Sequence, residues 1–136
     1  MTERRWHRRL AAYCAGVVSG ALLLAACGGG GGDGGSQGYR EPKGPASETI
    51  SIKTGNYFFQ PDKITTNAGV VKLQLVGSDG DHTLVFDNGK EPGFQLEVDG
   101  GQTDAKKIDL KPGKYTFYCD ILGHRAQGME GTITVK

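Results

Sequence analysis

Three side chains able to bind a soft metal ion lie within one short stretch near the end of the 136-residue chain. Cys119, His124 and Met129 have the spacing Cys-x4-His-x4-Met and offer a thiol, an imidazole and a thioether. Residues 115–119 alternate in the manner of a β-strand, and a second strand-like run, 132–135, follows the methionine. The three donors are therefore predicted to lie on one tight connection between two strands.

A further donor, His82, stands at the start of another strand-like run, residues 83–86. Taken singly, a buried cysteine, a loop methionine or a lone histidine is most often an ordinary packing or surface residue. Together, however, one thiolate, two imidazoles and a weak thioether are the ligand set of a type 1 copper site. One cysteine with two histidines supplies too few strong ligands for a structural zinc site. The set of four residues therefore predicts copper.

The elements that must position these donors are short strands. From residue 48 onward, apolar residues alternate with polar ones between turns rich in Gly, Asp, Asn and Pro, and no helical period of useful length occurs. The alternating sets include Ile50 and Ile52; Val71, Leu73 and Leu75; and Phe94, Leu96 and Val98. This pattern predicts an all-β domain over residues 48–136, a Greek-key β-sandwich of seven to eight strands. A neighbouring strand of such a sandwich can bring His82 to the loop.

At this point the domain resembles a cupredoxin of the plastocyanin, azurin and auracyanin kind. The residues that carry the resemblance are Phe59-x-Pro61-x-x-Ile64, the isolated His82, Gly113-x-Tyr115-x-Phe117-Tyr118-Cys119 and Gly128-Met129-x-Gly131-x-Ile133-x-Val135. The spacing of the ligand loop looks most like that of auracyanin. The resemblance implies one type 1 copper ion held by His82, Cys119 and His124, with Met129 as the axial ligand.

Two residues near the thiolate differ from common members of that family. Thr83 occupies the position where many members have an asparagine whose side chain joins the two ligand loops. A threonine forms fewer hydrogen bonds, so a weaker junction is expected there, although its backbone amide can still reach the sulfur. Ile121 keeps an amide that plastocyanins lose to a proline. Donors of this kind, outside the ligand set itself, tune a bound metal.

The resemblance also implies where electrons enter and leave. His124 is expected to reach the surface within an apolar patch formed partly by Leu122, Ala126 and Gly128, and to be the electron port. Tyr118 follows the strand beside Cys119 on its outward face and resembles the aromatic residue that gives plastocyanin a second exit. An ordinary exposed strand tyrosine is an equally good interpretation of Tyr118, so both remain open.

A packed site without an open coordination position favours outer-sphere one-electron transfer between redox protein partners over catalysis. An enzyme of the copper nitrite reductase or multicopper oxidase kind would need a second such domain or His-x-His pairs, which this sequence does not contain. The binuclear copper-A centre would need a second cysteine in the loop. The alternative is an extracytoplasmic copper-binding and delivery lipoprotein, which would need an open site rich in Met or His.

The start of the chain predicts export and lipid attachment. Residues 1–26 combine an arginine-rich segment with an apolar run that ends in Leu24-Ala25-Ala26-Cys27, which resembles the lipobox of bacterial lipoproteins. A plain secretory signal is the alternative. The lipobox interpretation predicts acylation at Cys27, followed by a disordered Gly-rich linker over residues 27–47. The domain would then be anchored at the outer face of the bacterial cytoplasmic membrane, periplasmic or at the cell surface.

The charge and the cysteines exclude other classes. The domain is close to neutral and has no basic stripe, so nucleic-acid binding is not expected. Cys14, Cys27 and Cys119 lie at unrelated kinds of position and form no disulfide framework. Cys14 would be removed with the signal peptide, which leaves Cys119 as the thiol of a domain that we expect to be a monomer.

Overall fold

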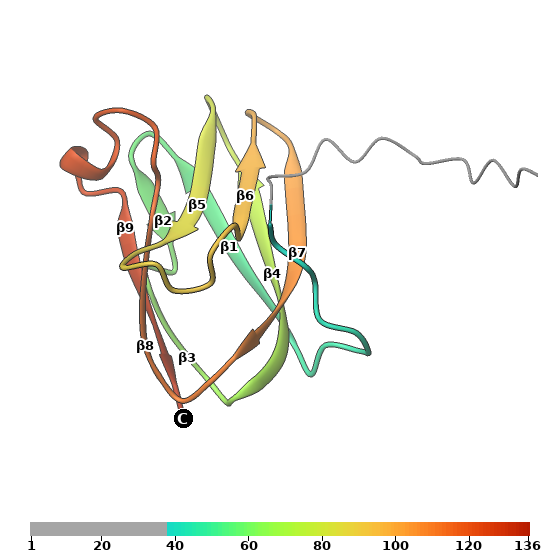
Figure 1. Cartoon of the computed structure of the whole chain (residues 1–136). Helices are drawn as coiled ribbons and strands as arrows, with labels where there is room; N and C mark the ends of the chain where they lie inside the picture. Colours follow the sequence, from blue (N-terminus) through green and yellow to red (C-terminus); the bar gives the residue numbers. More distant parts are fainter. Residues whose placement is uncertain (1–37) are drawn as a thin grey trace, which may run out of the picture. The chain divides into compact units, whose positions relative to one another are not determined.

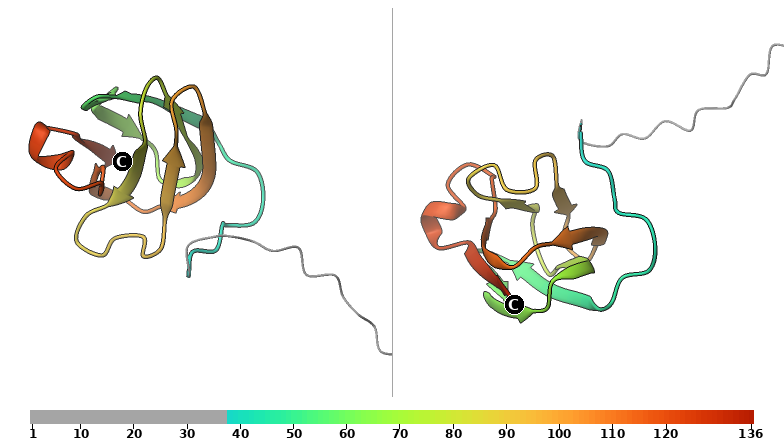
Figure 2. Two further views of the ribbon diagram at one scale, coloured as in Figure 1. Left: turned by 90° about the horizontal axis from the view of Figure 1, so that it is seen from above. Right: turned by 60° about the horizontal axis from the view of Figure 1, so that its bottom comes forward.

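The computed structural model describes residues 38–136, in which the predicted strands form two β-sheets packed against each other (Figures 1 and 2). The predicted signal peptide, Cys27 and the linker as far as residue 37 lie outside the described residues. In the described part of the chain, no helix is long and apolar enough to cross a membrane. The all-β sandwich expected from the sequence is confirmed.

The two sheets contain four and five strands. The four-stranded sheet has the order β2 (Phe58–Gln60), β1 (Thr49–Gly55), β4 (Gly69–Gly77) and β7 (Thr103–Leu110). The five-stranded sheet has the order β3 (Lys63–Thr66), β9 (Glu130–Val135), β8 (Gly113–Tyr118), β5 (His82–Phe86) and β6 (Gln95–Val98). A single 3-10 turn, η1 (Arg125–Gln127), precedes β9 in the described residues.

The described residues form nine strands, one more than the upper number expected, because the run around Pro61 divides between the sheets. β2 pairs with β1, whereas β3, two residues after Pro61, pairs with β9 in the other sheet. Proline has no N–H to continue a ladder, which explains why the chain changes sheet there.

The core between the sheets is built from the alternating apolar residues. Twelve of its residues have no solvent exposure in the structure: Ile52, Val71, Leu73, Leu75, Leu84, Leu96, Ile108, Leu110, Phe117, Cys119, Met129 and Ile133. Burial of each aliphatic or aromatic side chain among them contributes about 1.5–3 kcal/mol. A side chain at Gly131 would clash with the Phe117 ring, so this glycine lets the aromatic ring of β8 lie directly against β9. The strands that flank the predicted ligand loop are thereby packed closely together.

The antiparallel pairing of three strands brings their ends to one edge of the sandwich. β5 and β8 are antiparallel, so the start of β5 at His82 and the end of β8 before Cys119 lie at the same edge. β9 is antiparallel to β8, so its start after Met129 lies there too (Figure 1). The topology therefore gathers the loops that carry all four predicted ligands.

Residues of the predicted linker from position 38 onward contact the domain. Tyr39 donates a hydrogen bond from its hydroxyl to the carbonyl of Lys107 (2.7 Å), and its ring meets the ring of Phe94 edge to face, with 5.0 Å between centroids. Lys107 also donates from its amide to Glu41 (3.2 Å) and from Nζ to the carbonyl of Gly44 (3.0 Å). Glycine content predicted disorder, but one aromatic ring attaches this segment beside the edge strand β7 (Figure 2).

The contact of Tyr39 gives a pH-dependent contribution to stability. Burial, followed by the nearby carboxylates of Glu91 and Glu41, raises the pKa of Tyr39 from 10.0 to about 12. The contribution of its neutral hydroxyl is therefore complete below pH 10 and is lost as the pH rises towards 12. We expect Tyr39→Phe to lower the free energy of unfolding by about 1 kcal/mol at pH 8. Urea unfolding should show this difference shrinking above pH 10, and a constant difference would contradict the assignment.

Candidate metal centre

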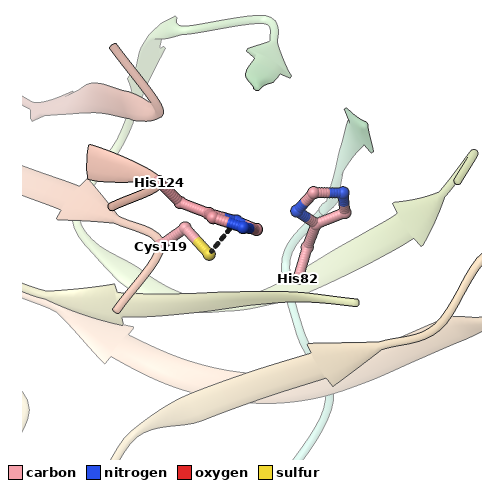
Figure 3. Close-up of side chains that lie close together, drawn as sticks. All are labelled: His82, Cys119 and His124. Carbon is pink, nitrogen blue, oxygen red and sulfur yellow. Dashed lines mark hydrogen bonds between the residues drawn. The ribbon is translucent and has the colours of Figure 1, made fainter. Parts of the chain in front are cut away.

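Three of the predicted ligands come together at the edge of the sandwich. The donor atoms of His82, Cys119 and His124 all lie within 4.8 Å of one another (Figure 3). The Cys119 sulfur lies 3.4 Å from Nδ1 of His124, and the two imidazole centroids are 5.3 Å apart. Nitrogen and sulfur donors at about 2.0–2.3 Å from one metal ion are roughly 3–4 Å apart in a three-ligand plane. The arrangement therefore has the dimensions of a metal site.

The environment of His82 supports metal binding independently. Its side chain has no solvent exposure, and neither ring nitrogen has a hydrogen-bond partner among the described residues. A carboxylate oxygen of Asp79 lies 3.7 Å from Nε2, beyond hydrogen-bond distance. Leaving a buried polar atom without a partner costs about 1–3 kcal/mol. Coordination of a metal would give one of these ring nitrogens a partner, and the buried free thiol of Cys119 lies within 4.8 Å of this imidazole.

Backbone hydrogen bonds fix the loop that carries the other donors. The Cys119 amide donates to the carbonyl of Met129 (3.2 Å), and the Met129 amide donates to the carbonyl of His124 (3.2 Å). η1 ends at Gly128, whose left-handed φ of 95° lets its amide donate to the carbonyl of Arg125. Met129 has no solvent exposure and belongs to the core. Its backbone is bonded to those of Cys119 and His124, and the expected axial role of its side chain stays a prediction.

Thr83 forms the junction between the two ligand loops through a residue that the sequence did not indicate. Its amide donates to the Cys119 sulfur (3.4 Å), and its hydroxyl oxygen lies 3.5 Å from the same sulfur. The hydroxyl also donates to Oδ1 of Asp120 (2.5 Å) and accepts from the Asp120 amide (3.0 Å). The weaker junction expected at Thr83 is thus replaced by two hydrogen bonds to Asp120.

Ile121 contributes a backbone carbonyl to the ligand loop, whereas the sequence suggested a contribution from its amide. Among the described residues, the backbone amide that donates to the Cys119 sulfur is that of Thr83, and no such bond from the Ile121 amide is found. The carbonyl of Ile121 accepts from the His124 amide (3.0 Å), which helps to orient that ligand. Tuning of the sulfur by the Ile121 amide therefore stays a prediction.

The outer side of the site is apolar and partly exposed. His124 is half-buried, and Leu122 beside it is 99% exposed. The ring of Tyr57, 44% exposed and contributed by the connection between β1 and β2, meets the His124 ring edge to face, with 4.8 Å between centroids. Sequence reasoning missed Tyr57, because the contact joins residues far apart in the chain. Tyr57 and the exposed residues Leu122, Ala126 and Gly128, which the sequence predicts around His124, are together called the apolar rim below.

The outer face of Tyr118 is covered by a cation. The guanidinium of Arg125 lies 4.1 Å from the centroid of the Tyr118 ring. Arg125 also pairs with Asp87 (2.7 Å) and with Glu130 (2.6 Å). The hydrogen bond to Asp87, followed by that to Glu130, raises the pKa of Arg125, and the same bond is the main cause of the lowered pKa of Asp87. Arg125 is thereby held in place over the aromatic ring.

Residues 46–136 match the family model for copper-binding proteins of the plastocyanin/azurin family. The fold and the group of donors agree with that match, and the chain belongs to this family. Its cofactor is one type 1 copper ion, and the protein is an electron-transfer protein of the cupredoxin class rather than an enzyme.

Individual relatives support the same assignment. The chain is 34% identical over 105 residues to plastocyanin of Dryopteris crassirhizoma, a match that covers 67% of this chain and 100% of that protein. It is 32% identical over 108 residues to plastocyanin of Nostoc punctiforme, covering 67% of this chain and 76% of the relative. Among solved structures, auracyanin B shares the fold with a TM-score of 0.62 at 18% identity, covering 75% of this chain and 96% of that one.

The colour of the copper-loaded protein tests the site directly. We expect an intense visible absorption from thiolate-to-copper charge transfer, and we expect Cys119→Ser to abolish it because no other thiol lies in the described domain. Circular dichroism should show that the sandwich remains folded. Cys27→Ser is the matched control and should keep the absorption, while strong absorption in Cys119→Ser would contradict the ligand assignment.

Proposed function

We propose that His82, Cys119 and His124 bind the copper ion strongly and that Met129 is its weak axial ligand. In this proposal the protein carries single electrons between redox partners as a monomer, anchored by lipid at the outer face of the bacterial cytoplasmic membrane. The observation that carries the proposal is the convergence of the three donors at one edge of the sandwich, with two of them buried.

The burial and rigidity of the ligands favour electron transfer. When bound, the copper ion supplies a one-electron couple between Cu(I) and Cu(II). The backbone bonds among Cys119, His124 and Met129 hold these residues in place, so little rearrangement is needed when the charge of the site changes. Copper delivery would require ligands that open easily, and the full burial of His82 and Cys119 does not favour it.

The surface of the site supports His124 as the electron port. It is the one partly exposed residue among the three clustered donors, and the apolar rim around it is suited to a brief contact with a partner. Tyr118 is less suitable as a second exit, because Arg125 covers its ring and is itself fixed by two carboxylates. A partner would meet a guanidinium there before it met the ring.

A charge placed in the apolar rim should therefore slow electron transfer. Self-exchange requires two copies to bring their rims together, and Leu122→Lys adds like-charge repulsion and a desolvation cost to that contact. We expect a slower self-exchange rate, measured by NMR line broadening, at unchanged copper content. Thr134→Lys is the matched control, because it adds the same charge at an exposed position near the far end of β9. Equal rates for Leu122→Lys and the wild type would move the port away from His124.

The proposed anchor rests on the Leu24–Cys27 motif and on the arginine-rich segment before it. Because Tyr39 is attached to β7, the tether between Cys27 and the domain ends at Tyr39 instead of residue 47. Twelve residue steps span at most about 40 Å. The domain would consequently remain close to the membrane while the copper site meets its partners.

Lipid attachment has a simple test in bacterial cells. Cys27→Ser should prevent acylation, so the protein should no longer partition into the detergent phase with membrane lipoproteins. Cys14→Ser is the control and should behave like the wild type, since Cys14 lies within the predicted signal peptide. Mass spectrometry that showed an unmodified mature amino terminus at another residue in the wild type would rule out the anchor and leave the electron-carrier assignment unaffected.

A further inference from the structure

We propose that Asp120 is a positioning residue for the copper site, because it captures the proton of the Thr83 hydroxyl and keeps that hydroxyl from donating to the Cys119 sulfur. This inference rests on the proposed function in one respect, namely that Cys119 holds the copper. Asp120 consequently lowers the reduction potential of the copper site in two ways. Its negative charge favours Cu(II), and it reduces the number of hydrogen bonds donated to the thiolate.

The geometry around the Thr83 hydroxyl carries the first step. Its oxygen lies 2.5 Å from Oδ1 of Asp120 and 3.5 Å from the Cys119 sulfur. A hydroxyl has one proton, and an ionised carboxylate can only accept. The 2.5 Å distance lies in the range of charge-assisted O–H···O⁻ bonds, about 2.5–2.7 Å. The proton therefore belongs to the bond with Asp120, and the sulfur receives none from this hydroxyl.

A second hydrogen bond between Thr83 and Asp120 fixes the orientation of the hydroxyl. Its oxygen accepts from the Asp120 amide at 3.0 Å, so Asp120 contacts it through both its side chain and its backbone. Thr83 follows His82 on β5, and Asp120 follows Cys119 after β8. The pair thus joins the backbones that carry two of the three clustered donors, and it determines the hydroxyl's direction at the same time.

The consequence for the sulfur follows from the number of donors. With the hydroxyl bound to Asp120, the Thr83 amide at 3.4 Å is the remaining donor to the Cys119 sulfur in the described residues, apart from Nδ1 of His124, which lies 3.4 Å from the sulfur and belongs to a proposed copper ligand. Hydrogen bonding around the cysteine sulfur tunes the potential of a type 1 site. A donated bond withdraws electron density from the thiolate and disfavours Cu(II), so the absence of the hydroxyl bond favours Cu(II) and lowers the potential.

Burial makes the hydroxyl available to the sulfur when Asp120 is replaced. Thr83 is only 5% exposed, and buried hydroxyls find an acceptor wherever one is in reach. Once the carboxylate is removed, the Cys119 sulfur is the acceptor that remains within 3.5 Å of the hydroxyl in the described part of the chain. Asp120→Ala should therefore add a donor to the thiolate as well as remove a charge.

A double-mutant cycle separates these two effects. Wild type, Asp120→Ala, Thr83→Val and the double variant are loaded with copper, and the reduction potential and the energy of the thiolate charge-transfer band are measured. Asp120→Ala should raise the potential by more in the wild-type background than in the Thr83→Val background, because only the former has a hydroxyl to release. Equal shifts in the two backgrounds would overturn the proton capture and leave Asp120 acting through charge alone.

A second comparison does not require Thr83 to be changed. Asp120→Asn removes the charge but keeps an oxygen that can accept the hydroxyl proton, so the band of this variant should stay near the wild-type energy. In Asp120→Ala the band should shift. Asp81→Ala is the matched control, because Asp81 is an exposed aspartate directly before the ligand His82. Its effect on the potential should be equal with and without Thr83→Val, and identical bands for Asp120→Asn and Asp120→Ala would contradict the proposal.

A measurement on the metal-free protein completes the test. The Thr83 hydroxyl proton should be visible by NMR and exchange slowly with water in the wild type, and it should exchange faster in Asp120→Ala. Equally rapid exchange in both proteins would overturn the inference. Failure of the wild type to show type 1 absorption would instead refute the proposed ligands, so the two failures are distinguishable.

Discussion

The burial of unpartnered donor atoms is the constraint on which this structure depends. Neither ring nitrogen of His82 has a hydrogen-bond partner within residues 38–136, its side chain has no exposure there, and Cys119 is equally buried. Polar atoms in such surroundings reduce stability unless something binds them. The fold must therefore supply enough apolar burial to tolerate them, and it does so with two sheets whose facing side chains are almost entirely aliphatic or aromatic. Copper then compensates for the cost that the packing tolerates.

The same packing explains why the ligands are held at fixed positions. Phe117 lies directly against Gly131, so β8 and β9, which flank the ligand loop, are packed closely together. Across the loop, the amides and carbonyls of the ligands bond to one another instead of to solvent. Ligands held by such backbone bonds need little rearrangement when the charge of the site changes, which is the property that a carrier of single electrons requires.

Local patterns in the sequence predicted most of this arrangement, and contacts between distant segments account for what they did not predict. Cys119, His124 and Met129 share one loop, so their spacing alone indicated a common site. The contact between Thr83 and Asp120 joins residues 37 positions apart, and it depends on strand register and side-chain direction. The contact of Tyr39 with the domain was missed for a different reason. The glycine-rich composition of its segment predicted a linker, and a single aromatic residue gave no signal against that prediction. The division of the run around Pro61 into β2 and β3 could not be predicted, because it depends on which sheet each of the two strands joins.

The ligand loop also separates the tasks of its residues. The hydrogen bonds that Cys119, His124 and Met129 form with one another through their backbones do not involve the side chains at positions 120 and 122. Leu122 points its apolar side chain into solvent, where it can meet a partner. Asp120 instead forms hydrogen bonds with the Thr83 hydroxyl, which lies close to the Cys119 sulfur. Leu122 thus affects the contact with a partner, whereas Asp120 affects the surroundings of the sulfur and links the ligand loop to β5 through Thr83.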